Sequence, residues 1–354
     1  MGAEAGGGGG RGAGELKSSS IVGEVQGPSC GLSVAFAAEA VNMVYVTQKV
    51  VHYSIWVNIL TVLQMRCFLA QMWHTDDGGA PVARVSIVCI AMQALMDAYD
   101  SFLHLCLGLS SQYMFNTVAV ISLFKFILFS LLEARYLLMI WRQRLPDIFN
   151  QGWETVRREL SWLYSRFYGV LIVGLMLLYQ NLDHLDFIVL GFQAYWLPQI
   201  VHDMWHGSKS ALCPMFVCGI SATRLLLVLY LWGCPETIFS GDLYPELPGA
   251  PSSTICIIAV AMQAAQVSVM LLQRRWGPRW FVPWVCMPWA YNYRRSSTVD
   301  PGTDCVICMT EIDPEDARRV TTPCNHKFHE TCLEQWMEVK MECPTCRTIL
   351  PPIQ

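Results

Sequence analysis

The chain has little charge. Of its 354 residues only 15% are Asp, Glu, Lys or Arg, whereas about 25% is usual in soluble domains. The deficit is concentrated between residues 53 and 273, where long stretches carry almost no charged side chain. The formal net charge of −4 argues against binding to nucleic acid by phosphate neutralisation, so we expect no nucleic-acid partner.

The first residues lack an apolar core of the kind that a cleavable signal peptide has. Residues 1–30 are Gly-rich and are expected to form a flexible tail. Residues 31–52 are expected to form a short lumenal stub with a strand, because Val44, Tyr45 and Val46 favour β-structure. A transmembrane helix over 32–51 is the alternative, since this stretch is apolar apart from a few polar residues.

What is abundant is hydrophobic sequence, at 53% of the chain. A helix needs about 20 apolar residues to cross a bilayer core, and a backbone in lipid must be helical to satisfy its amides. An all-α polytopic bundle over 53–273 is therefore predicted. The connection 142–166 is expected to contain an amphipathic helix that either lies on the membrane surface or packs on its neighbours. About seven transmembrane helices are expected, at 53–73, 85–107, 115–141, 168–180, 187–205, 212–231 and 254–273.

Positive charge is distributed unevenly among the connections. Residues 142–166 and the segment after the last span hold five arginines each, while 108–114, 181–186 and 234–253 hold no Lys or Arg. Because connections rich in Lys and Arg remain in the cytosol, the C-terminus is predicted to be cytosolic and the N-terminus lumenal.

Several polar residues interrupt the apolar spans. Gln93, Asp97 and Asp100 share one helical face, and others are expected at membrane depth: Gln64, Arg66, Lys125, Glu133, Arg135, Arg224, Gln263 and Gln266. Such groups need a partner or a water-filled cavity. They indicate either structural pairs, for example Asp97 or Asp100 with Arg66 or Arg224, or a polar surface that engages polar membrane segments of other proteins.

After a juxtamembrane linker at 274–300, the segment 301–354 carries eight metal-ligand residues, most of them in closely spaced pairs. Their types and spacings are enough to close two tetrahedral zinc sites. The candidate ligands are Cys305, Cys308, Cys324, His326, His329, Cys332, Cys343 and Cys346. Each site would have four protein ligands and no open position, so two structural Zn²⁺ ions are predicted, in a module that unfolds without metal.

The order of three cysteines, two histidines and three cysteines resembles a RING-H2 finger. The cross-brace of that family implies one site from Cys305, Cys308, His329 and Cys332, and a second from Cys324, His326, Cys343 and Cys346. In RING fingers of ubiquitin ligases, a shallow groove binds the ubiquitin-conjugating enzyme (E2). The resemblance implies that the E2-binding and activating residues are Ile307, Leu333, Trp336, Pro344 and Arg347. It implies no catalytic residue in this chain, because the thioester chemistry belongs to the E2.

The membrane portion is similar to transmembrane ubiquitin ligases of the Dsc/Tul type. The resemblance rests on residues 53–55 (YSI), 63–65 (LQM), 92–100 (MQALMDAYD), 277–283 (GPRWFVP) and 291–293 (YNY). In this family a multi-span bundle precedes a cytosolic RING-H2 finger within a multi-subunit complex for Golgi and endosomal protein quality control. Its members usually begin with a signal peptide and a large lumenal domain, and this sequence shows neither. The substrate or partner roles of that domain are therefore not carried over to this chain.

Together these features predict an all-α polytopic membrane bundle followed by a small cytosolic cross-brace RING-H2 zinc finger. The expected function is that of a RING-type E3 ubiquitin transferase of Golgi or endosome, with the endoplasmic reticulum as the alternative compartment. The expected partners are an E2, ubiquitin, membrane-protein substrates and other subunits of a ligase complex. The alternatives are a transporter or channel whose RING controls its own turnover, and a non-enzymatic zinc scaffold.

Overall fold

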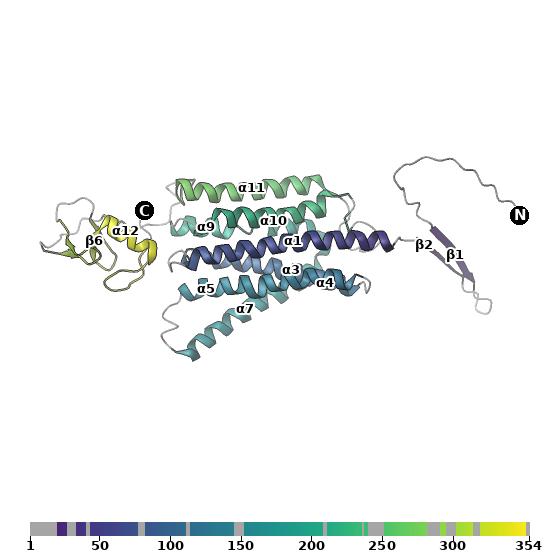
Figure 1. Ribbon diagram of the computed structural model, residues 1–354, viewed down its shortest axis with the longest axis horizontal. Helices are drawn as coiled ribbons and strands as arrows, with labels where there is room; N and C mark the ends of the chain where they lie inside the picture. The colour runs from purple at the N-terminus through teal and green to yellow at the C-terminus, as the bar shows by residue number, and fades with distance from the viewer. Residues whose placement is uncertain are drawn as a thin grey trace.

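The structure is a computed structural model that is dominated by a bundle of helices. It describes residues 20–26, 33–39, 43–76, 82–110, 114–144, 152–207, 211–235, 237–239, 251–281, 291–294, 302–313 and 319–351. A two-stranded hairpin lies at one end of the bundle and a small zinc-finger-like module at the other (Figure 1).

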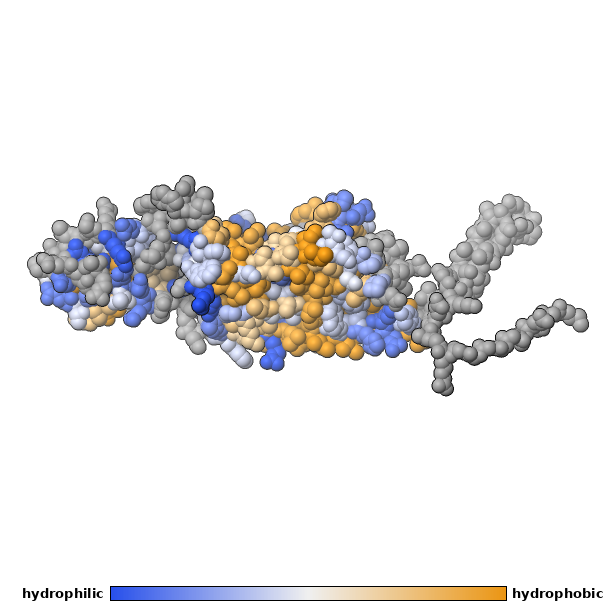
Figure 2. Space-filling view, turned by 90° about the horizontal axis from the view of Figure 1, so that it is seen from above, coloured by the Kyte–Doolittle hydropathy of each residue, from blue (hydrophilic) through white to orange (hydrophobic). Residues whose placement is uncertain are grey.

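Most helices of the bundle run along a common direction, and α7 is inclined to them (Figure 1). Their bounds are α1 (Met43–Asp76), α3 (Ile87–Ser110), α4 (Phe115–Ile127), the π-helical segment η1 (Leu128–Glu133), α5 (Ala134–Arg144), α7 (Trp153–Gln180), η2 (Leu182–His184), α8 (Leu185–Phe192), α9 (Leu197–His206), α10 (Pro214–Gly233) and α11 (Ser253–Trp276). Figure 2 shows an apolar band over the middle of the bundle, with hydrophilic residues toward its ends.

Within the described ranges, five helices are long and apolar enough to cross a membrane. They are Val44–Thr75, Phe115–Arg144, Trp153–Gln180, Pro214–Gly233 and Ser253–Trp276. The prediction of seven spans is not confirmed. Helix α3 is less apolar because it carries Gln93, Asp97 and Asp100, and the expected span at 187–205 is divided between α8 and α9. The chain is a multi-pass membrane protein.

Two expected boundaries in the membrane region are corrected. Val44, Tyr45 and Val46 lie in α1 and not in a strand, so the first helix begins well before Tyr53. Helix α7 joins the expected amphipathic helix to the expected fourth span in one run of 28 residues, because no Pro or Gly-rich turn separates them.

The N-terminal hairpin corrects the expected tail. Strand β1 (Ser20–Gln26) lies within the segment 1–30, and it pairs antiparallel with β2 (Ser33–Glu39), from Ser20 opposite Glu39 to Gln26 opposite Ser33. The β-branched residues Ile21, Val22 and Val25 favour this strand. Residues 1–19 of that tail lie outside the described residues.

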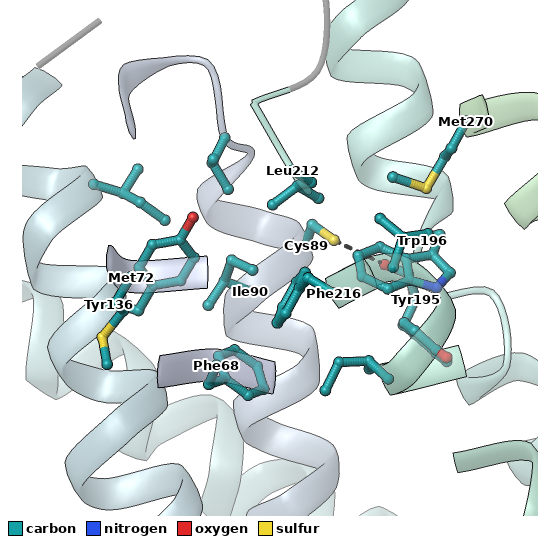
Figure 3. Packing of buried hydrophobic residues seen from close by; sticks show 14 of the residues in the cluster. Phe68, Met72, Cys89, Ile90, Tyr136, Tyr195, Trp196, Leu212, Phe216 and Met270 are labelled. Carbon is teal, nitrogen blue, oxygen red and sulfur yellow. Dashed lines mark hydrogen bonds between the residues drawn. The ribbon is translucent and has the colours of Figure 1, made fainter. Parts of the chain in front are cut away.

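The main apolar core joins helices that are distant in the sequence. Phe68 of α1, Ile90 of α3 and Phe216 of α10 are almost fully buried, and the Phe68 and Phe216 rings meet edge-on with centroids 4.9 Å apart. Figure 3 shows Ile90 and Phe216 between Tyr136 on one side and Trp196 on the other. This cluster holds α1, α3, α5 and α10 together near the end that bears the zinc-finger-like module.

Candidate functional site

The C-terminal module brings the eight predicted ligands into two groups. Each group offers four ligand atoms that all lie within 4.8 Å of one another. The first group contains Cys305, Cys308, His329 and Cys332, and the second contains Cys324, His326, Cys343 and Cys346. This is the alternating pairing that the cross-brace implies, so the predicted partition of the ligands is confirmed.

The atoms in each group fit a zinc ion. Zn–S bonds of 2.3 Å in a tetrahedron separate neighbouring sulfur atoms by about 3.8 Å. Here His329 Nδ1 lies 3.3 Å from Cys308 Sγ and 4.0 Å from Cys332 Sγ. His326 Nδ1 lies 3.4 Å from Cys324 Sγ and 3.5 Å from Cys343 Sγ. Both histidines therefore present Nδ1 to the site, and the two clusters are compatible with two zinc ions.

Two tight turns hold the paired cysteines. The backbone N–H of Met309 donates to the Cys305 carbonyl at 2.7 Å, and that of Arg347 donates to the Cys343 carbonyl at 2.8 Å. Met309 and Arg347 both have φ of 58°, a left-handed conformation that costs free energy for residues other than glycine. The same turn is thus built twice, and in the second turn it presents Arg347 to solvent.

The sequence prediction missed two threonines beside the ligands. Thr310 Oγ1 lies 2.9 Å from Cys308 Sγ, and Thr348 Oγ1 lies 3.1 Å from Cys346 Sγ. Hydrogen bonds from the Thr310 side chain and backbone lower the pKa of the Cys308 thiol to about 6, and Thr348 lowers the pKa of Cys346 to about 6 in the same way. Both favour the thiolate, which is the form that binds zinc. The signal in the sequence was a Thr two residues after the second Cys of each pair.

The fold around the ligands is small. Strands β3 (Asp304–Cys305) and β4 (Thr310–Glu311) form one hairpin, β5 (Arg319–Thr321) and β6 (Lys327–His329) form another, and helix α12 (Glu330–Val339) follows. The core of this module consists of Tyr293, Ile312, Val320, Phe328, Leu333, Met337 and Leu350, together with Cys305 and Cys343.

The predicted E2-contact residues divide into two groups. Ile307, Trp336 and Pro344 are half-buried, and Arg347 is exposed. Leu333 is 0% exposed and packs inside the core, so the expectation that it contacts the E2 directly is corrected. The period of α12 turns Leu333 inward, into the core of the module. The Trp336 indole N–H donates to the Glu342 carbonyl at 2.9 Å, which fixes the ring.

The module begins earlier than the predicted boundary at 301. Tyr293 is 3% exposed within its core, its carbonyl accepts from the Thr321 N–H at 2.8 Å, and its hydroxyl donates to the Pro351 carbonyl. Arg294 forms an ion pair with Glu330 at the start of α12. The end of the expected linker is therefore part of the folded module.

A second cluster of polar side chains lies inside the helical bundle. Asp97 is 1% exposed and lies 2.5 Å from Arg224 Nη2 and 2.8 Å from Lys125 Nζ. Lys125 Nζ also lies 3.1 Å from Asp100 and donates to Gln64 Oε1 at 3.1 Å. The expected pairing of Asp97 with Arg224 is thus confirmed.

Two other residues that were expected at membrane depth face outward. Arg66 and Arg135 are exposed on the bundle surface. Glu133, by contrast, is 0% exposed and lies 3.6 Å from Arg224 Nη2. It is the last residue of η1, a π-helical turn of the kind that often marks functional positions within a helix. No periodic pattern in the sequence predicted that turn.

The ion-pair cluster borders a cavity between helices. This cavity of about 840 Å³ is lined by Asp97, Asp100, Lys125 and Arg224 on its polar side. Apolar residues of α3, α7, α8 and α10 form the remaining walls, for example Leu175, Val189 and Leu227. The arrangement is a mostly apolar cavity with four charged groups at one place, two of each sign.

Comparison with known proteins assigns a family to both the helical bundle and the C-terminal module. Residues 42–286 match the family described as transmembrane E3 ligase/DUF2921 transmembrane domain, and residues 303–347 match the Ring finger domain. The chain belongs to this transmembrane E3 ligase family. The resemblance to Dsc/Tul-type ligases is therefore confirmed, and the C-terminal module of this family member is a RING.

Curated relatives agree with this assignment. Transmembrane E3 ubiquitin-protein ligase FLY1 of Arabidopsis thaliana is 41% identical over 91% of this chain and 57% of its own length. FLY2 of the same plant is 40% identical over the same shares. DSC E3 ubiquitin ligase complex subunit 1 of Schizosaccharomyces pombe is 25% identical over 94% of this chain and 58% of its own length. The chain spans somewhat more than half the length of these relatives, and no solved structure matches it.

Proposed function

We propose that this chain is a membrane-embedded RING-type E3 ubiquitin ligase that recruits E2~ubiquitin and promotes ubiquitin transfer to membrane proteins in quality control. The observation that carries the proposal is the pairing of a fully assembled set of RING ligands with an accessible surface of Ile307, Trp336, Pro344 and Arg347. Membership of the transmembrane E3 ligase family supports it.

In this proposal the RING acts by positioning. Ile307, Trp336 and Pro344 offer apolar surface to the E2, and Arg347 contacts E2 and donor ubiquitin together. Holding the thioester in a near-attack geometry lowers the entropic part of the barrier, while the nucleophile and the thioester remain on the other proteins. The metals serve only to hold the RING in shape, because neither ligand group leaves an open position.

The test is discharge of ubiquitin from a purified, charged E2 by the full-length protein in detergent. We expect Ile307→Ala and Arg347→Ala each to lower the discharge rate by at least about 10-fold, while zinc content and helicity stay unchanged. A matched control is Ile349→Ala, an exposed apolar residue outside the proposed contact set. Equal rates in wild type and both variants, across a panel of E2 enzymes, would overturn the proposal.

The proposed substrates are membrane proteins with polar groups in their spans. Such a span lacks good partners in lipid, and the charged groups Asp97, Asp100, Lys125 and Arg224 offer it partners beside an apolar cavity wall. Filling the cavity with Leu227→Trp should reduce ubiquitination of such a span and spare E2 discharge. Unchanged ubiquitination would contradict this part of the proposal.

The distribution of arginines supports the proposed orientation of the RING, and the resemblance to Dsc/Tul-type ligases supports the proposed compartment. Arg142, Arg144, Arg274 and Arg275 lie at the ends of α5 and α11, at the RING end of the bundle (Figure 1). The positive-inside rule then favours a cytosolic RING, where ubiquitin is present. The resemblance to Dsc/Tul-type ligases favours Golgi or endosome, and two relatives are named as subunits of a ligase complex, so we propose partner subunits here as well. Protease accessibility of the RING in sealed organelles tests the orientation, and co-sedimentation with Golgi and endosomal markers tests the compartment.

One observation favours a second candidate function. Helix α8 of the broken pair α8–α9 lines the cavity that holds the four charged groups, and discontinuous helices beside a cavity at membrane depth are typical of transporters. Substrate flux in vesicles that persists after deletion of residues 301–354 would favour a transporter whose RING controls its own turnover. A RING that never discharges an E2 would favour a zinc scaffold.

A further inference from the structure

The connection between α1 and α3 makes direct contact with the RING. Arg84 lies in this connection at the RING end of the bundle, and one of its Nη atoms donates to the carbonyl of Met337 at 3.0 Å. The same nitrogen lies 4.0 Å from the sulfur of Met341. Met337 belongs to the last turn of α12, and the final carbonyls of a helix have no partner within it. A cation there meets both an unpaired acceptor and the negative end of the helix dipole.

The bundle holds Arg84 on a fixed platform. Val82 and Val85 on either side of it are buried in the main apolar core. The buried Gln199 of α9 accepts from the Ser86 N–H at 2.7 Å and donates to the Arg84 carbonyl at 3.3 Å. Arg144 at the end of α5 donates to the Val85 carbonyl at 2.7 Å. Helices α5 and α9 thus fix the backbone around Arg84.

On the other side of the contact, the same turn of α12 presents the proposed E2 surface. Trp336 is the residue before Met337, and its carbonyl accepts from the Lys340 N–H at 2.8 Å. Its indole donates to Glu342, one residue beyond Met341. Arg84 therefore binds the part of the RING that fixes Trp336, so the contact couples the bundle to the E2 surface.

The chain that leaves the bundle toward the RING is anchored at the bundle end. Arg279 donates to the carbonyls of Met204 and Trp205 at the end of α9, which fixes the exit from the bundle. The folded RING unit begins at Tyr291, ten residues after Phe281. The Arg84 contact therefore joins the bundle to the RING at a second place, apart from the chain itself.

We propose that Arg84 is a positioning residue that docks the RING on the membrane bundle, so that E2~ubiquitin faces the membrane in one orientation. Ubiquitin then reaches acceptor lysines only within a limited zone beside the bundle. This inference rests on the proposed ligase function for its consequence, whereas the docking contact itself is independent of ubiquitin chemistry.

The experiment uses the full-length protein in lipid vesicles as wild type, Arg84→Ala, Arg84→Lys and the control Arg275→Ala, an exposed arginine at the same end of the bundle. A photo-cross-linking amino acid at the exposed position Lys340 reports docking. We expect cross-links to residues 82–86 in wild type and control, a loss of at least about 5-fold in Arg84→Ala, and partial rescue in Arg84→Lys.

The second measurement uses a single-span reporter protein that is held on the ligase by an epitope tag. Its lysines lie at graded distances from the membrane, and the measurement is which of them become ubiquitinated. Wild type and control should modify a narrow set of lysines, and Arg84→Ala should spread modification along the series while E2 discharge changes less than about 2-fold. Cross-linking and lysine pattern both unchanged in Arg84→Ala would overturn the proposal. Cross-links that depend on Arg84 in a protein that never transfers ubiquitin would support docking and refute the proposed ligase function instead.

Discussion

The RING and the membrane bundle keep their shapes by opposite means. The RING buries few apolar side chains, and its two ligand groups join segments that have little other reason to meet. The bundle has an extensive apolar core, and its buried charged residues Asp97, Lys125 and Arg224 are paired with one another inside it. In a small module, structural metals can therefore stabilise a fold whose apolar core is too small to do so alone. In the bundle the apolar core stabilises the fold, and each buried charge would destabilise it without a partner of opposite charge.

The largest effect is expected from the removal of one zinc ligand, which should unfold the RING and leave the bundle folded. Cys305→Ser should unfold the RING and abolish E2 discharge, because a cross-brace module of this size depends on both metals for its folding. Zinc content and limited proteolysis would check this in the full-length protein, with Cys218→Ser, an exposed cysteine of α10, as the control. Retention of two zinc ions and full activity in Cys305→Ser would show that the RING does not depend on this ligand for its folding.

A large effect is also expected within the bundle. Asp97→Ala leaves Lys125 and Arg224 buried without their shared carboxylate, which should cost about 3–5 kcal/mol of stability. The measurement is thermal stability in detergent, together with zinc content. Loss of bundle stability with both zinc ions retained would show that the two regions are stabilised separately. An unchanged melting temperature would show that the bundle does not depend on this carboxylate.

A smaller effect is expected beside the zinc ligands. Thr310→Val removes the hydroxyl that lies against Cys308 Sγ and favours its thiolate, so zinc affinity of that site should fall about 10-fold or more. Competition with a zinc chelator checks this on the full chain. Thr310→Ser keeps the hydroxyl and should behave as wild type; equal loss in both variants would point to packing instead.

The smallest effect is expected for an ion pair on the surface of α7. Glu154 and Arg157 lie 2.8 Å apart but their side chains are 78% and 64% exposed. Glu154→Ala should change stability by less than about 0.5 kcal/mol, because water and salt screen exposed charges. The same melting experiment provides the measurement, and a loss as large as that of Asp97→Ala would show that burial is not what distinguishes the two pairs.

The sequence alone determined the features that depend on residue type and spacing. The eight ligands and most of the apolar helices could be identified from residue type and spacing, because metal chemistry and the bilayer impose local patterns. The division of the ligands between two sites came from the resemblance to RING-H2 fingers. The sequence also allowed the pairing of Asp97 with Arg224 to be named as one of four possible pairings of Asp97 or Asp100 with Arg66 or Arg224, since a buried charge requires an opposite one.

The tertiary structure decided what depends on distant neighbours. It turned Leu333 into the RING core, placed Tyr293 in the same core and left Arg66 on the outside of the bundle. It also brought Arg84 to the last turn of α12, a contact between residues far apart in the chain. Patterns of apolar residues fix which face of a helix is buried, but only the packing of one element on another determines which partner that face meets.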